Sequence, residues 1–196
     1  MSEINDAVDS IKEMSEREER DLNHSDHLNS RIAILVALTA TFMTICNIKD
    51  GNIVQNMARA EAQRVNYWSY YQAKSTKQNM TEEMLDVLDS RQAANREIIR
   101  KYREKITRYE SEKKEIMAKA EEQENYYNDL NVYDDQFDLT EALLTMSMAL
   151  YGITSLTKKK WLYYFSIFLS GTGIFIGFLA FLKIPVQLEF LSKILG

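Results

Sequence analysis

Two apolar runs near the carboxyl end form the strongest hydrophobic pattern in the chain. They cover residues 139–156 and 161–183, and only the turn Thr157-Lys158-Lys159-Lys160 separates them. A helix needs roughly 17 to 25 residues to cross the hydrocarbon core of a bilayer, so each run predicts a transmembrane helix. The lysines of the turn at 157–160 mark its cytoplasmic side under the positive-inside rule.

A shorter apolar run at residues 31–48 predicts a further transmembrane helix. It contains three threonines, whose hydroxyls can bond to carbonyls of their own helix. The preceding residues 1–30 are acidic and lack the apolar core of a cleaved signal peptide, so we expect them to remain in the cytoplasm. With the lysine turn also inside, residues 49–138 must lie outside.

The charged segment 49–138 is helical by pattern and must leave and return to the same membrane face. The best candidate for its turn is Asp89–Asn95, which carries cap-type residues. Apolar positions at alternating steps of three and four predict a coiled-coil seam on the returning arm. Its members are Ile99, Tyr102, Ile106, Tyr109, Lys113, Ile116, Ala120, Gln123, Tyr127 and Leu130. We expect residues 125–138 to form a looser link back to the membrane.

The fold class that follows is an all-α integral membrane protein, with three transmembrane helices and an extramembrane antiparallel coiled-coil hairpin. Residues 184–196 follow the last span. Pro185 should end or redirect that helix, and the apolar positions after it are typical of a short amphipathic helix in the membrane interface.

Two sets of residues are candidates for oligomerisation or packing. In the hairpin they are the seam positions Tyr102, Ile106, Tyr109 and Ile116. In the last span they are Gly173 and Gly177, whose small-xxx-small spacing lets helix backbones approach closely.

An aromatic patch on the outgoing arm is the densest unusual feature. It consists of Tyr67, Trp68, Tyr70 and Tyr71. These residues cover more than one face of a helix, because successive residues step by about 100°. They can pack against the returning arm or a neighbouring copy, or they can line a ligand or peptide groove, in which Tyr and Trp supply contact area.

The composition offers little to catalysis. The chain has two histidines, His24 and His27, which could share one helical face, but no third ligand stands at zinc spacing. The acidic cluster Asp134, Asp135 and Asp138 lacks the periodicity of a calcium loop. The single cysteine, Cys46, cannot close an intrachain disulfide. We expect no catalytic residue, no bound metal and no cofactor, and hence no enzyme.

Three motifs follow one another along the chain, namely Tyr67–Ser75, Tyr102–Glu110 and Leu156–Tyr163. Together, in this order, they resemble a bacterial membrane family catalogued as domain of unknown function 4337. The resemblance covers about residues 31–182. It implies one amino-terminal span, a charged helical hairpin and a closing pair of spans, and it brings no biochemical activity.

We therefore expect a membrane-anchored scaffold or adaptor of the bacterial inner membrane. Its partners would be copies of itself, the lipid bilayer and another envelope protein, with no nucleic acid. A second hypothesis is ligand or peptide binding at the aromatic patch. A third is a channel or transport subunit whose pore is lined by hydroxyls. The hydroxyls in question belong to Thr39, Thr41, Thr44, Ser166 and Ser170. A scaffold leaves them bonded within helices, whereas a pore needs them on a shared axis.

Overall fold

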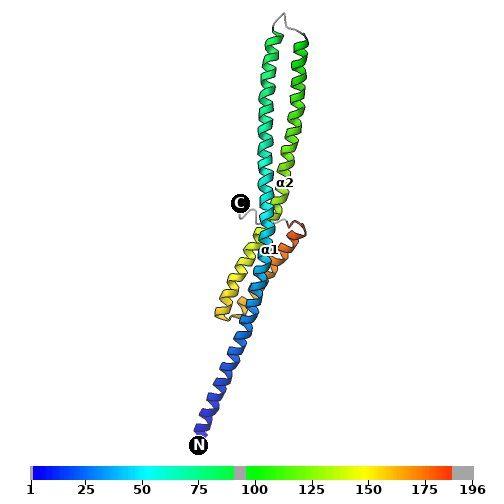
Figure 1. Ribbon diagram of the computed structural model, residues 1–196. Coiled ribbons are helices and arrows are strands. Elements are labelled where there is room, and N and C mark those ends of the chain that lie inside the picture. The colour runs from blue at the N-terminus through cyan, green and yellow to red at the C-terminus, as the bar shows by residue number, and fades with distance from the viewer. Residues whose placement is uncertain (1, 91–95, 187–196) are drawn as a thin grey trace. The chain divides into compact units, whose positions relative to one another are not determined.

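The residues that the structure describes form three helices and no strand. The computed structural model describes the backbone of residues 2–90 and 96–186 and the side chains from Asp26 onward. Helix α1 spans Ser2–Asp89, α2 spans Arg96–Thr157 and α3 spans Lys160–Phe181 (Figure 1). Each helix contains a stretch long and apolar enough to cross a membrane. The predicted interfacial tail lies almost wholly outside the described residues.

The chain divides into two compact units. Unit 1 combines residues 1–50 with residues 135–196, and unit 2 is the hairpin of residues 51–134. Helix α1 ends at Asp89 and α2 begins at Arg96, so the turn falls where cap-type residues predicted it. The predicted looser link at residues 125–138 is wrong, because α2 continues through it without interruption. Its Asn, Asp and Tyr residues are tolerated within a helix that has tertiary partners.

Unit 2 is held together by facing seams on its two antiparallel helices (Figure 1). All ten seam positions predicted on α2 are buried or half-buried. A matching set on α1 also recurs at alternating steps of three and four. It consists of Ile53, Met57, Ala60, Arg64, Tyr67, Tyr71, Lys74, Gln78, Thr81, Leu85 and Leu88, all buried or half-buried. We call these two sets together the inner seam.

In unit 1, α3 packs closely on α2 through small side chains. Its buried positions recur at helical spacing and are Leu162, Ser166, Ser170, Gly173, Gly177 and Ala180. A Cβ atom added at Gly173 would lie 2.9 Å from Leu144 Cδ2, and one added at Gly177 would lie 2.9 Å from Thr140 Cγ2. Hence both glycines are required for close approach inside the chain.

Helix α1 also packs against α2 and α3 in unit 1. The Phe42 ring contacts the Phe181 ring edge-on at 6.4 Å between centroids, and Phe181 meets Phe137 of α2 in the same way at 5.3 Å. Further along, the Ser155 hydroxyl donates to Asn29 Oδ1 at 3.0 Å. These contacts join all three helices into one bundle.

Lysines in left-handed conformation end both α2 and α3. Lys158 has φ 54° and its N–H donates to the Thr154 carbonyl. Lys183 has φ 56°, its N–H donates to the Ala180 carbonyl, and the N–H of Ile184 donates to Leu179. The latter pair is a Schellman motif, which satisfies the last carbonyls of a helix. Helix α3 therefore ends at Phe181, four residues before Pro185. The Schellman motif, and not the proline, ends this helix.

We predict that Gly177→Val destabilises the protein while Gly171→Val does not. The valine at 177 would collide with Thr140 and Phe42, whereas a Cβ at 171 meets nothing within 4 Å. Overpacking of this kind costs about 1–3 kcal/mol. Thermal unfolding followed by circular dichroism in detergent measures the difference, and both variants share the same helix propensity. Equal melting of the two variants would contradict the packing described for α3.

Candidate functional site

The middle of the inner seam is polar and joins the two arms by ion pairs. Lys74 Nζ contacts Glu112 Oε2 at 2.5 Å, and Arg64 lies 3.7 Å from Glu124. Arg64 also holds Glu61 by two hydrogen bonds of 2.9 Å along its own helix. The Lys74–Glu112 and Arg64–Glu124 contacts join residues far apart in sequence, so they fix the register of α1 against α2.

These contacts change the proton affinities of the groups involved. The hydrogen bond from Lys74 holds the pKa of Glu112 below its ordinary value, and the nearby charge of Arg108 adds to this effect. The hydrogen bond from Arg64 likewise lowers the pKa of Glu61. Both carboxylates are therefore more stable as anions in the folded hairpin than in the unfolded chain.

Tyrosine rings within the seam accept lysine side chains from the opposite arm. Lys74 Nζ lies 5.5 Å from the centre of the Tyr109 ring, and Lys113 Nζ lies 5.5 Å from the centre of the Tyr71 ring. Such cation–π contacts attract the ammonium group to the face of the ring. The seam thus combines aromatic, apolar and charged contacts rather than a continuous apolar core.

The structure separates the predicted aromatic patch into two pairs. Tyr67 and Tyr71 are half-buried and belong to the inner seam. Trp68 and Tyr70 point outward with 37% and 54% of their surface exposed, and the Trp68 and Tyr71 rings form a T-shaped contact with 5.5 Å between centroids. Two surface hollows on α2, lined by side chains within residues 96–107 and 118–129, include none of the four.

The candidate packing residues all lie on contact surfaces within a single copy of the chain. Tyr102, Ile106, Tyr109 and Ile116 are half-buried on the face of α2 that carries the inner seam. Gly173 and Gly177 are buried in unit 1. The sequence pattern identified these residues as contact positions but did not distinguish contacts within one chain from contacts between copies.

The outer surface of α1 carries a second heptad-spaced set that the sequence analysis missed. We call it the apolar stripe: Tyr70, Ala73, Lys77, Met80, Met84 and Val87. Tyr70, Met80, Met84 and Val87 expose 54%, 64%, 47% and 47% of their surfaces. The signal was present in the sequence as steps of three and four offset from the inner seam.

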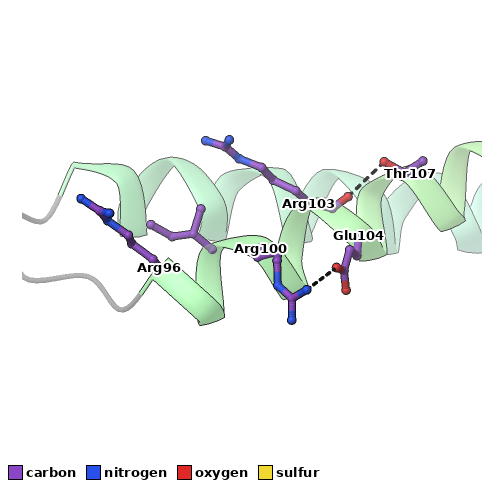
Figure 2. Close-up of a pocket in the computed structure, with 6 residues that line it drawn as sticks. Arg96, Arg100, Arg103, Glu104 and Thr107 are labelled. Carbon is purple, nitrogen blue, oxygen red and sulfur yellow. Dashed lines mark hydrogen bonds and ion pairs between the residues drawn. The ribbon is translucent and has the colours of Figure 1, made fainter.

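A groove lies on α2 beside the turn of the hairpin (Figure 2). Its volume is about 560 Å³, and it is lined by Arg96, Ile99, Arg100, Arg103, Glu104 and Thr107. Arg100 lies 3.6 Å from Glu104, and the Thr107 hydroxyl donates to the Arg103 carbonyl at 3.2 Å. The groove is therefore open, basic and formed by one helix.

The hydroxyl groups considered for a pore bond mainly within their own helices. On α1, Thr41 and Thr44 are exposed and donate to the carbonyls of residues 37 and 40. On α3, Ser166 donates to the Leu162 carbonyl, and Ser170 is buried beside the Tyr151 hydroxyl at 2.9 Å. These hydroxyls do not share one surface, because Thr41 and Thr44 face outward whereas Thr39, Ser166 and Ser170 are buried.

Metal-ligating side chains are not gathered in the part of the chain whose side chains are described. No group of three or more His, Cys, Asp and Glu side chains there is arranged so that it could hold a metal ion. Cys46 is a buried free thiol in unit 1. The side chain of His24 lies outside the described residues, so the structure does not test the His24–His27 pair.

We predict that acid weakens the hairpin. A carboxylate whose pKa is lowered by folding adds stability above its unfolded pKa, about 4.3 for Glu, and this stability is lost as the pH falls through the folded pKa. Circular dichroism melts of the full chain in detergent should therefore shift to lower temperature between pH 7 and about pH 3. The double variant Glu61→Gln/Glu112→Gln should lose part of that shift.

Glu110→Gln is the control, because Glu110 is exposed on α2, the helix that carries Glu112. This variant should keep the full acid-induced shift. The same shift in the double variant and in the wild type would contradict the ionic account of the seam.

Comparison with known proteins yields one match. No curated protein and no solved structure matches the chain. The sequence matches the family described as Domain of unknown function (DUF4337) over residues 28–183. This range includes all of the hairpin and the described bundle residues from 28 to 50 and 135 to 183. The chain therefore belongs to the DUF4337 family.

Proposed function

We propose that the chain is a non-enzymatic scaffold or adaptor, anchored in the membrane by three helices, that self-associates through its coiled-coil hairpin. The apolar stripe carries the proposal. Six heptad-spaced positions on one outer face of α1 include four large side chains that are about half exposed or more. Contiguous exposed apolar surface of this kind marks a protein interaction site, since its burial releases water.

The location proposed for this scaffold is the bacterial inner membrane. The lysine turn at 157–160 would lie in the cytoplasm together with the amino terminus, which places the hairpin outside. The three helices are compatible with this arrangement in length and composition. The partners are a second copy of the chain, the lipid bilayer and another envelope protein.

The stripe is suited to self-association because it repeats the spacing of a coiled-coil seam with one charged member. A single lysine within an apolar seam reduces stability but restricts the register and the number of helices that can pair. Lys77 has this position between Ala73 and Met80. The hairpin thus has an inner seam filled by its own arms and a second seam available to a neighbour.

We predict that the wild-type protein is an oligomer in lipid nanodiscs, with the mass of more than one chain when measured by mass photometry. The variant Met80→Ser/Met84→Ser/Val87→Ser should associate at least about tenfold more weakly, because each buried Met or Val contributes roughly 1.5–3 kcal/mol. The matched control is Val54→Ser/Val132→Ser, which alters exposed apolar residues of unit 2 outside the stripe. A wild-type protein with the mass of one copy at every concentration would overturn the proposal.

A further inference from the structure

The two arms of the hairpin carry opposite charges next to the turn. On α1, residues 81–89 contain Glu82, Glu83, Asp86 and Asp89 and no lysine or arginine. On α2, residues 96–108 have an excess of basic side chains. A hairpin with this separation of charge presents an acidic arm and a basic arm to its surroundings.

Three arginines on α2 share one face. Arg96, Arg100 and Arg103 follow each other at steps of four and three, and they line the groove seen in Figure 2. We call them the arginine stripe. The side chains of Arg100 and Arg103 are 69% and 65% exposed. Most of their donor groups are therefore available to an acidic partner.

An acidic set on α1 lies on the same flank of the hairpin. Glu82, Asp86 and Asp89 also follow each other at steps of four and three, and we call them the acidic stripe. Arg103 lies 3.4 Å from Asp89 Oδ2, a contact that joins the ends of the two stripes. The antiparallel register set by Lys74 and Glu112 keeps the stripes level with each other.

The same flank carries apolar side chains further from the turn. On α1, the heptad spacing of the acidic stripe continues back to Trp68 and Val65, and on α2 the spacing of the arginine stripe continues forward to Met117. Val65, Trp68 and Met117 expose 53%, 37% and 38% of their surfaces. The flank therefore combines charge near the turn with apolar contact area along its middle.

We infer that this flank pairs with the same flank of a second copy, so that the acidic stripe of each hairpin meets the arginine stripe of the other. Two copies anchored in one membrane run in the same direction. A two-fold axis along that direction places α1 of one copy against α2 of its neighbour at the same level. Opposite charges then meet twice, and Trp68 of each copy comes level with Met117 of the other.

A second copy fits this flank better than an anionic membrane or polymer. Such a surface would be attracted by the arginine stripe but repelled by the acidic stripe beside it. A second copy offers both signs in the required order. This inference rests on the proposed function, because it adds to the apolar stripe a second surface through which the hairpins associate.

Cross-linking between two different copies tests the pairing directly. One copy carries Asn79→Cys and the other carries Thr107→Cys, both in a Cys46→Ser background. Position 79 lies on the α1 side of the flank and position 107 on the α2 side, at similar levels. In membranes treated with an oxidant we expect a covalent heterodimer. The control pair Lys77→Cys and Thr107→Cys places one thiol on the apolar stripe, away from the flank, and should give little product.

Charge reversal then distinguishes ionic pairing from chance proximity. Arg96→Glu/Arg100→Glu in both copies should reduce cross-linking at least about tenfold, since acidic side chains then face each other. Glu82→Lys/Asp86→Lys in both copies should do the same. When one copy carries Arg96→Glu/Arg100→Glu and the other carries Glu82→Lys/Asp86→Lys, opposite charges face each other again at both contacts. This mixture should restore the cross-linked heterodimer. Lys101→Glu/Lys105→Glu, which changes the charge equally on another face of α2, should leave cross-linking unchanged.

Three results would overturn the inference. The first is equal cross-linking in all charge variants, and the second is failure of the mixed pair when circular dichroism shows both variants to be helical. The third is binding of the purified protein to phosphatidylglycerol vesicles that is lost in Arg96→Glu/Arg100→Glu while cross-linking is unchanged. In each case, the proposed function still stands if the wild-type protein is an oligomer in nanodiscs. If the wild-type protein is a monomer, both the inference and the proposed function are wrong.

Discussion

Antiparallel packing of α1 against α2 is the interaction on which the rest of the structure depends. In unit 2 it joins Lys74 to Glu112 and Arg64 to Glu124, and in unit 1 it brings Met43 within 3.9 Å of the Thr145 hydroxyl. Neither arm of the hairpin has another partner of comparable length in the described residues. An isolated helix of such polar composition would have little tertiary stabilisation. The register of α1 against α2 therefore determines which residues remain exposed on the surface of the hairpin.

The composition of the inner seam limits what the hairpin can do alone. Its middle is filled by charged, amide and tyrosine side chains, and Gln78 Oε1 is buried without a hydrogen-bond partner in the described structure. Two helices joined this way bury less apolar surface than a compact domain. In the proposed assembly, the exposed apolar and charged stripes are the surfaces through which further area is buried between copies. This is the physical reason to regard the hairpin as an interaction module and not as an enclosed binding site.

Much of this architecture could be predicted from the sequence, because long-range pattern and local chemistry agree. The lysine turn, the break at Asp89 and the seam on α2 follow from hydropathy and heptad spacing. The continuity of α2 through residues 125–138 could not be predicted, since Asn and Asp favour turns locally and only tertiary packing reverses that preference. The apolar stripe was missed because Lys77 interrupts it and because no pattern shows which of two seams the chain fills itself.

We propose that three helices anchor the chain and place the hairpin on the outer side of the membrane. Single cysteines at Ser25, Ser90 and Thr157, in a Cys46→Ser background, test it when intact cells are treated with a thiol reagent that cannot cross membranes. The account predicts labelling at Ser90 alone, with Ser25 and Thr157 labelled only after the cells are opened. Labelling of Ser25 and Thr157 with protection of Ser90 would invert the topology. Equal labelling of Ser90 and Thr157 would contradict the spans between them.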